Sequence, residues 1–234
     1  PVSYLGALWV RQTSARSMYR GMTLSSQYRA GRMQFGAFYT LSETFSDDDQ
    51  ERDASGFRYD NSFNLRPEYG YSVLDMRHQF TGYAVASLPL GLEVSSRFRF
   101  ASGKPFDART GADTNEDLAS NDRPYKAPGV TYERNSFRNR GFRGLDARAL
   151  KSFPVTDRVK VQFSAEFFNL FDFSNVVYAG TNLNYGLGID PVTGNTVAAP
   201  TSFMRLKLAT GEFDPINTQL GSPFQMQLGL RLIF

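Results

Sequence analysis

Apolar and polar side chains alternate along several stretches of this 234-residue chain. In the last stretch one side carries Phe224, Met226, Leu228, Leu230, Leu232 and Phe234, and the other carries Gln225, Gln227, Gly229 and Arg231, with Ile233 as an apolar exception. A period of two residues is typical of a β-strand with one apolar face. Alternation alone does not separate a strand packed against a second sheet from a strand that faces lipid.

The same alternation recurs along the chain. It predicts strands near residues 18–30, 33–42, 77–88, 92–101, 144–153, 159–171 and 223–234, with the pattern weaker in the first and fifth ranges. Most of these segments are about 9 to 11 residues long, the length of a tilted strand that crosses a bilayer. The fold class is therefore all-β.

The connections between these segments are of two kinds that alternate along the chain. Tight turns fall at Gly31, Pro89 and Asp157, whereas long connections span residues 43–74, 102–142 and 172–222. Compact soluble domains seldom contain several connections of that length. Outer-membrane barrels have short periplasmic turns at one rim and long extracellular loops at the other. We therefore predict an antiparallel transmembrane β-barrel, in which the last strand ends at the periplasmic rim.

Composition excludes several other classes. A hydrophobic content of 41% with 15% aromatic residues is too high for a disordered chain. The absence of cysteine excludes a disulfide scaffold and a thiolate metal site. No apolar run approaches the roughly 18 residues of a membrane-spanning helix. Because the chain opens at Pro1 with neither an initiator Met nor a secretion signal, we expect a fragment of a longer envelope protein.

Seven charged residues of the predicted strands fall on the polar side. We expect these to face a wet lumen: Glu93, Arg97, Arg99, Arg148, Lys160, Glu166 and Arg231. A charge facing lipid near the bilayer midplane costs about 2 to 4 kcal/mol, so such charges belong on the lumen face. Arg148 and Glu166 lie on neighbouring predicted strands, and we predict that they form a cross-strand pair.

Two acidic segments raise the question of a metal site. Asp113, Asn115 and Asp117 stand at alternate positions, as do the first ligands of a calcium loop, but Leu118 and Pro124 replace the required glycine and glutamate. We therefore interpret this segment as a polar outer loop and expect no metal. The acidic run 47–53 predicts a solvated loop tip, with divalent-ion bridging to lipopolysaccharide as the alternative.

Basic and aromatic residues cluster at the end of the second long connection, residues 102–142, and just after it. The cluster contains Arg134, Phe137, Arg138, Arg140, Phe142 and Arg143. Such a run could stack on bases and contact phosphates, but the balance of 26 basic and 23 acidic residues indicates no nucleic-acid partner. At a barrel rim these residues would line the lumen or contact a plug or lipid phosphate. The single histidine, His78, is expected at the rim.

No residue pattern indicates an enzyme. Paired carboxylates, a nucleophile elbow, a phosphate loop and a metal cluster are all missing at the spacing that catalysis needs. We therefore predict no catalytic residues and no cofactor.

Two sets of motifs carry a family resemblance. The ending formed by Gln227, Gly229, Leu232 and Phe234 resembles the membrane-insertion signal that the barrel assembly machinery recognises. The segments "SARSMYRGMTLSSQYRAG", "DMRHQFTGYAVASLPLG", "FRFASGKPF" and "EFFNLFDFSN" resemble, in order and spacing, the C-terminal barrel region of Oar-like TonB-dependent receptors.

The resemblance implies a receptor and transporter in the outer membrane of a Gram-negative bacterium. Such a receptor has an N-terminal plug inside a barrel of about 22 strands, of which residues 1–234 would supply about seven or eight at the C-terminal end, without a recognisable plug. It implies substrate binding at the outer loops and energy-coupled uptake. The implied partners are membrane lipid and lipopolysaccharide, the plug, TonB and the barrel assembly machinery, whereas the substrate stays open.

Two other functions remain open from the sequence. The chain could be a self-contained eight-stranded barrel that acts as an anchor or adhesin, if residues 4–12 supply an eighth strand. It could also be a secreted soluble β-sandwich that binds glycans, in which case the apolar strand faces would pack on each other.

Overall fold

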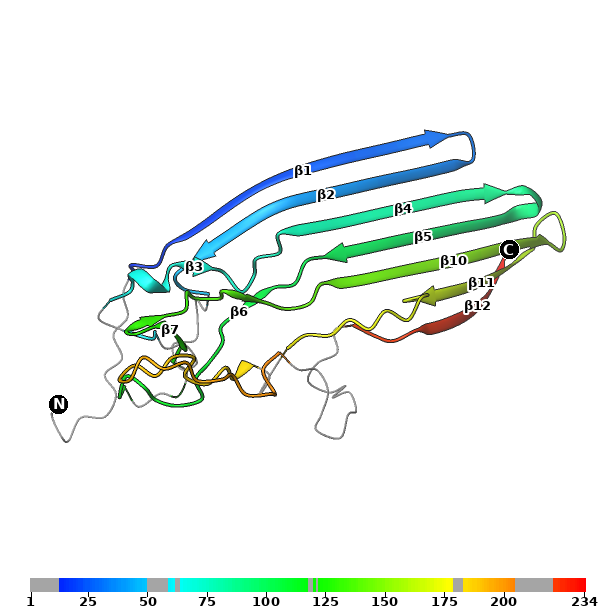
Figure 1. The fold of residues 1–234 in the computed structure, drawn as a ribbon. Helices are drawn as coiled ribbons and strands as arrows, with labels where there is room; N and C mark the ends of the chain where they lie inside the picture. Colours follow the sequence, from blue (N-terminus) through cyan, green and yellow to red (C-terminus); the bar gives the residue numbers. More distant parts are fainter. Residues whose placement is uncertain are drawn as a thin grey trace.

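A single antiparallel sheet dominates the structure, a computed structural model that describes residues 13–49, 59–61, 64–117, 120, 122–178, 183–204 and 221–234. The sheet has eight strands in the order β1-β2-β4-β5-β10-β11-β12, with β3 (Gly70–Tyr71) paired to β2. Its long strands are β1 (Ser17–Ala30), β2 (Met33–Ser46), β4 (His78–Leu88), β5 (Leu92–Ala101), β10 (Phe142–Pro154), β11 (Lys160–Phe168) and β12 (Gln225–Ile233). Figure 1 shows these strands side by side in chain order. Within the described residues β1 and β12 do not pair, so the sheet is open.

Each predicted strand overlaps one of the long strands, and two boundaries differ by more than two residues. The strand β2 continues to Ser46 instead of ending near residue 42, because Phe45 and Ser46 pair with both β1 and β3. The strand β11 ends at Phe168 instead of residue 171. Asn169, which follows it, has a φ of 48°, a left-handed conformation that cannot continue a strand.

The tight turns lie together at one end of the sheet. They connect β1 to β2, β4 to β5 through the 3-10 turn η2 (Pro89–Gly91), and β10 to β11. In Figure 1 the C-terminus lies at this same end, and the long connections lie at the other. Gly31 and Gly91 have positive φ values of 54° and 71°, which glycine adopts without steric cost. The predicted separation of short turns from long loops is therefore present.

The two faces of the sheet differ in polarity. Residues that stand opposite each other on paired strands share a face. One face carries the row Leu228, Ala165, Ala149, Val94 and Ala86; the other carries the row Gln227, Glu166, Arg148, Ser95 and Val85. We call these the apolar face and the polar face.

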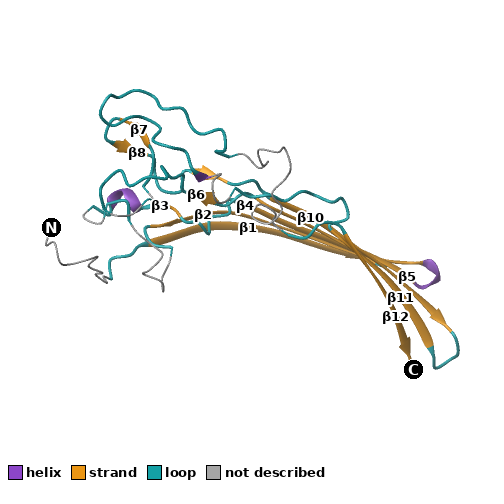
Figure 2. Ribbon diagram, turned by 90° about the horizontal axis from the view of Figure 1, so that it is seen from below, coloured by secondary structure: helices purple, strands orange, loops and turns teal. Residues whose placement is uncertain are grey.

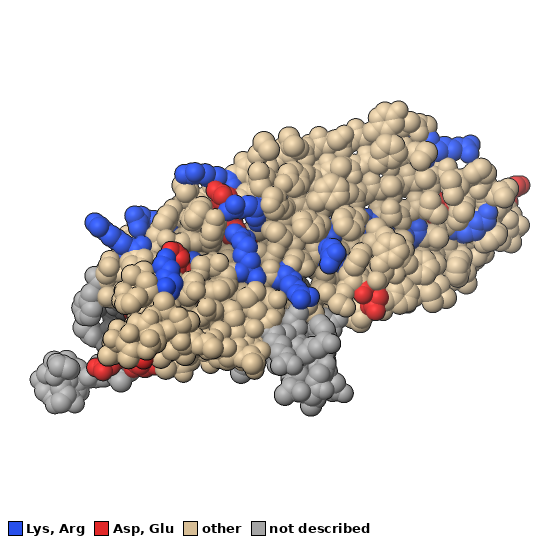
Figure 3. Space-filling view, viewed as in Figure 1, with Lys and Arg blue, Asp and Glu red and all other residues tan. Residues whose placement is uncertain are grey.

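No second sheet covers the apolar face in the described part of the chain. Its side chains stand far out, with Leu228 57% and Leu230 76% exposed. In the view of Figure 3 a wide area over β1, β2 and β4 has no charged side chain, and charged side chains gather toward the loop end. This face needs an apolar partner, because burial of such an area is worth roughly 25 cal/mol per Å².

The described parts of the long connections form a compact unit at the opposite end from the turns. They contain the paired strands β6 (Pro105–Phe106) and β9 (Phe137–Arg138), the paired strands β7 (Tyr125–Ala127) and β8 (Val130–Thr131), and the 3-10 turn η1 (Arg66–Glu68). Figure 2 shows these loops gathered on one side of the sheet. Phe106, Ala108 and Val176 are the buried apolar residues of the described structure, so its small core lies in the loops. None of the described helices has the length and apolar character required to span a membrane.

Candidate functional site

The polar face holds all seven charged strand residues for which the sequence predicts a lumen-facing position. The strand pairing places them on this one face: Glu93, Arg97, Arg99, Arg148, Lys160, Glu166 and Arg231. The predicted cross-strand ion pair is present, because Arg148 Nε lies 3.0 Å from Glu166 Oε1. The polar face is therefore the side of the sheet that offers charged groups to a ligand.

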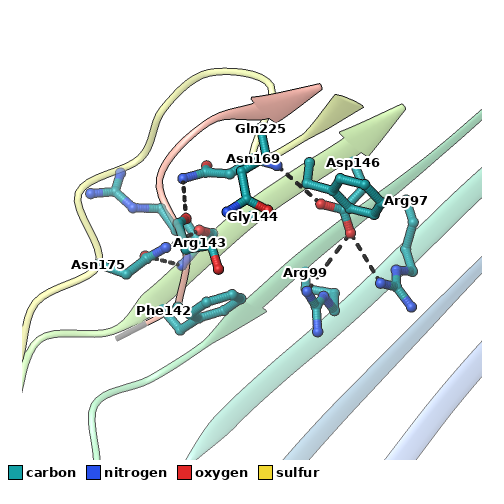
Figure 4. Close-up of a pocket in the computed structure, with 12 residues that line it drawn as sticks. Arg97, Arg99, Phe142, Arg143, Gly144, Asp146, Asn169, Asn175 and Gln225 are labelled. Carbon is teal, nitrogen blue, oxygen red and sulfur yellow. Dashed lines mark hydrogen bonds and ion pairs between the residues drawn. The ribbon is translucent and has the colours of Figure 1, made fainter. Parts of the chain in front are cut away.

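A cavity of about 300 Å³ opens on the polar face where β5, β10, β11 and β12 approach the loops. Figure 4 shows its walls. Its lining comprises Arg97 and Arg99 of β5, Phe142, Arg143, Gly144 and Asp146 of β10, Phe168 and Asn169 at the end of β11, Asn175, Gly221 and Ser222 of the connection between β11 and β12, and Gln225 at the start of β12. The cavity thus combines residues from distant parts of the chain.

One carboxylate serves two arginines in this cavity. Arg97 Nη2 lies 3.0 Å and Arg99 Nη2 3.7 Å from the same oxygen, Asp146 Oδ2. Arg97 and Asp146 stand opposite each other on β5 and β10, and Arg99 is one polar-face position away. The Arg99 guanidinium also lies 5.3 Å from the centre of the Phe142 ring. We call Arg97, Arg99 and Asp146 the arginine–aspartate group.

Asn169 connects this group to the loop before β12. Its backbone N–H donates to Asp146 Oδ1 at 3.1 Å. Its side-chain amide donates to the carbonyl oxygens of Phe173 and Ser222, both at 3.1 Å, and its Oδ1 accepts from Phe173 N–H at 2.9 Å. The motif that resembles the receptor family therefore has a structural role here, since Asn169 fixes the end of β11 against the start of β12.

A second polar cluster lies inside the loop unit. Arg123 donates two hydrogen bonds to Glu68, at 3.0 and 2.6 Å, and their side chains are only 4% and 3% exposed. Arg123 also pairs with Asp60 at 3.4 Å. Arg134 donates to the carbonyl oxygen of Ser46 and pairs with Asp49 at 2.8 Å. We call Asp49, Asp60, Glu68, Arg123 and Arg134 the buried ion-pair cluster.

Burial changes the ionisation of two carboxyls near this cluster. Burial raises the pKa of Asp107, although the N–H of Asn135 and the nearby Arg123 oppose the shift. Burial likewise raises the pKa of Asp60, against the N–H and the guanidinium of Arg123. Since desolvation disfavours the charged form of a carboxyl, both groups bind protons more readily than an exposed aspartate.

The expected solvated tip at residues 47–53 is wrong for two of its aspartates. Asp47 is buried and accepts from the backbone N–H of Arg16 at 2.6 Å. Asp49 pairs with Arg134 and accepts from Val73 N–H at 3.0 Å. The negative charges are therefore compensated by two arginines, Arg16 and Arg134, and by backbone donors from other segments. Residues 50–53 lie outside the described structure.

The expectation for the basic and aromatic run is also corrected in part. Arg134 and Arg138 pair with Asp49 and Asp75 instead of facing a plug or lipid phosphate. Phe137 packs against Tyr132 and Tyr185 inside the loop unit. Phe142 does line the polar cavity, together with Arg143, whose guanidinium lies 5.7 Å from the Phe173 ring. The remaining member, Arg140, lies just before β10.

The segment that resembles a calcium loop forms a turn. Asp117 N–H donates to Asp113 Oδ1 at 3.1 Å and to Asn115 Oδ1 at 3.0 Å. One oxygen of Asp113 and the amide oxygen of Asn115 therefore accept from the same backbone donor, as in an Asx turn. Among the described residues no three His, Cys, Asp or Glu side chains gather as a metal site would require.

The terminal motif divides between the two faces. Gln227 and Gly229 stand opposite Glu166 and Ser164 on the polar face, while Leu232 lies on the apolar face. A side chain at position 229 would clash with Ser164 Oγ, since a Cβ there would lie only 2.6 Å away. Phe234 is 93% exposed beyond the end of β12. At the opposite end of the sheet His78 begins β4, and its Nδ1 lies 2.8 Å from Tyr39 Oη.

The sequence analysis missed Asp146, the residue that joins the arginines to Asn169. The alternation of β10 contains a usable signal, because Asp146 has the same parity as Arg148 and therefore lies on the polar face. The buried pair Arg123 and Glu68 gave no such signal, since it joins two irregular loop segments.

Comparison with known proteins agrees with the architecture. A family model described as an outer membrane beta barrel domain matches residues 1–133 and 128–211. Comparison with curated proteins and with solved structures finds no significant match. The matched ranges include β1 to β11 and therefore most of the sheet with its apolar and polar faces. The chain belongs to the family of outer membrane beta barrel domains and is a protein of the outer membrane.

Proposed function

We propose that this chain is part of the barrel wall of a TonB-dependent receptor that carries a solute across the outer membrane. In this proposal the long loops contact the solute outside the cell, and the polar face lines a lumen of a barrel of about 22 strands. The motifs that resemble Oar-like receptors support the assignment, among them the segment 166–175 around Asn169.

The observation that carries the proposal is the open sheet. Lipid offers no hydrogen-bond partner to an unpaired strand edge, so a sheet in a membrane has to close into a barrel. In the described residues the outer edges of β1 and β12 have no partner strand. A barrel completed by further strands would satisfy both edges and would enclose the polar face, with its arginines and carboxylates, away from lipid.

The proposed partners follow from this arrangement. The apolar face would contact membrane lipid, and the loop end would contact lipopolysaccharide. Gln227, Gly229, Leu232 and Phe234 would present the insertion signal to the barrel assembly machinery. The polar face would contact a plug domain, and TonB would act through that plug. The proposal includes no catalytic activity, no cofactor and no nucleic-acid partner.

Barrel size tests the proposal directly. The intact gene, with its native upstream sequence, is expressed, and the outer-membrane fraction is run on a gel with and without boiling. We expect a heat-modifiable band far above 26.3 kDa, the mass of this chain. Photo-crosslinking in the same cells should join the protein to the periplasmic domain of TonB.

Other outcomes identify the remaining functions. A heat-modifiable band near 26.3 kDa would replace the transporter with a small barrel that anchors or adheres. A large barrel that never crosslinks to TonB would contradict energy coupling while keeping the barrel size. A product released from the cell without any heat shift would point to the glycan-binding sandwich.

A further inference from the structure

We propose that the cavity at the arginine–aspartate group is a binding subsite for an anionic solute group, a carboxylate or a phosphate. The inference rests on the proposed function, in which the polar face lines the lumen that the solute crosses. It names the chemical class of the solute that the receptor carries. The argument concerns Arg97, Arg99 and Asp146.

The charges in the group do not balance. Two guanidiniums share a single carboxylate oxygen, and Asp146 Oδ1 is already engaged by Asn169 N–H. Each guanidinium carries five N–H donors, of which Asp146 engages only a part. Within the described residues Arg97 and Arg99 have no other ion-pair partner. The side chains are 53% and 45% exposed, so the remaining donors are open to a solute.

The walls of the cavity suit a small anion. Arginine guanidiniums bind carboxylate and phosphate oxygens in a bidentate fashion, which gives both charge and geometric selection. The Phe142 ring lies against Arg99 and holds its guanidinium on one side. Gly144 lies in the lining beside this ring and carries no side chain, while the Gln225 amide lies on the wall contributed by β12. Figure 4 shows both arginines directed toward the Asp146 carboxylate from β5.

In this arrangement Asp146 is an internal competitor for the arginines. It neutralises part of their charge when the cavity is empty, and an incoming anion takes over one or both guanidiniums. The neighbouring pair of Arg148 and Glu166 has equal numbers of charges and lies outside the cavity lining. It therefore provides a matched comparison on the same face, on the neighbouring strands β10 and β11.

Chemical footprinting of arginine tests the subsite. Outer-membrane vesicles that contain the intact protein are treated with phenylglyoxal, which modifies free guanidiniums, and modification at each arginine is measured by mass spectrometry. Citrate and inorganic phosphate serve as anionic probes, and sorbitol serves as the neutral one. We expect both anions, or one of them, to slow modification at Arg97 and Arg99 several-fold while Arg148 changes little. Preference for citrate or phosphate tells which group the subsite takes.

The substitution Asp146→Asn separates a competing charge from a structural role. Loss of a structural role would weaken anion binding, whereas loss of a competing charge should strengthen it. Asparagine keeps the Oδ1 acceptor for Asn169 N–H but removes the competing charge. The citrate concentration that halves modification should fall about 2- to 5-fold, the effect expected from one half-exposed ion pair. Loss of protection in this variant, or equal protection of Arg148 and Arg97 in the unaltered protein, would overturn the subsite.

The test separates this inference from the proposed function. A large barrel that crosslinks to TonB but shows no protection at Arg97 and Arg99 overturns the anion subsite alone. Protection in a barrel of only 26.3 kDa keeps an anion site and overturns transport by a large receptor.

Discussion

At the scale of single residues, Asn169 joins the polar face to the connection between β11 and β12. Its left-handed backbone ends β11, and its N–H donates to Asp146. Its side chain bonds the backbone of Phe173 and Ser222, near the two ends of the connection between β11 and β12. Asparagine tolerates this backbone conformation better than most residues and supplies an acceptor and two donors in one amide. The identity of this residue is therefore explained by geometry and hydrogen bonding together.

Replacing Asn169 by glycine or by alanine separates these two contributions. Asn169→Gly keeps the backbone conformation but loses the three side-chain hydrogen bonds, which we expect to cost about 1 to 3 kcal/mol of local stability. Asn169→Ala adds about 1 to 2 kcal/mol because a Cβ disfavours positive φ. Hydrogen exchange measures the loss of local stability in both variants, in peptides that contain Leu170 and Phe224, whose N–H groups are hydrogen-bonded on either side of this connection. Equal exchange in the two variants would contradict the backbone contribution.

Asp107 provides a prediction about pH. Because burial raises its pKa above the ordinary 3.8, the folded loop holds this proton at pH values where the unfolded chain has lost it. The stability that the protonated Asp107 contributes is therefore fully present below pH 3.8, the ordinary pKa. It is lost as pH rises from 3.8 through the raised pKa of the folded protein. Asp107→Asn keeps the acceptor for Asn135 N–H and removes the charge. The variant should be the more stable protein at pH 7, with the difference shrinking toward pH 4.

Hydrogen exchange of the segment around Asn135 measures this difference, with both proteins compared at each pH so that intrinsic exchange rates cancel. A stability difference that stays constant between pH 4 and pH 7 would show that the Asp107 charge is not the cause. Asn135→Gly is a useful control, because it tolerates the positive φ of 52° and leaves the carboxyl and its N–H partner in place.

At the scale of elements, the long strands were predictable and the loop elements were not. A strand such as β11 imposes a period of two on its own residues, so Val161 and Phe163 report their face without reference to the rest of the chain. The short strands β6 and β9 have two residues each and depend on the loop path that brings them together. Asp49 was assigned to solvent for the same reason, since its partner Arg134 is far away in sequence.

The candidate site was predictable to the same extent. The positions of Arg97 and Arg148 on the polar face follow from strand periodicity, and so does the pairing of Arg148 with Glu166 once β10 and β11 are neighbours. The cavity itself was not predictable, because Asn169 and Gln225 meet only when the connection between β11 and β12 folds back. Periodicity gives the face of a residue, and tertiary contacts give its neighbours.

The pair of β10 and β11 is testable by charge exchange. Arg148→Glu or Glu166→Arg alone places like charges opposite each other across the two strands, which should destabilise the sheet by about 0.5 to 1 kcal/mol. The double variant should recover most of that loss. Urea midpoints of the four proteins, refolded in lipid vesicles, form the required cycle. A double variant as unstable as the sum of the single changes would mean that the pair has no net coupling.

At the scale of the whole molecule, the two faces of the sheet suit different surroundings. The apolar face exposes side chains such as Leu228 and Leu230, whereas the polar face carries ion pairs and a cavity. The loops supply the buried core that the single-layer sheet lacks. An outer-membrane location is consistent with these features, because in the proposed arrangement lipid would cover the apolar face, and the hydrogen-bonded strands leave few backbone groups unsatisfied.

Adjacent residues of β12 test this division between faces. Leu228 lies on the apolar face and Gln227 on the polar face opposite Glu166. Leu228→Arg should lower stability by about 2 to 4 kcal/mol if the position lies near the bilayer midplane, because the charge meets lipid. Gln227→Arg should change stability little, since its charge points to water and faces a carboxylate. Urea unfolding of protein refolded in vesicles gives both values without involving the cellular assembly machinery. Equal losses in the two variants would mean that lipid does not distinguish the faces, and the assignment of the polar face to a lumen would fail with it.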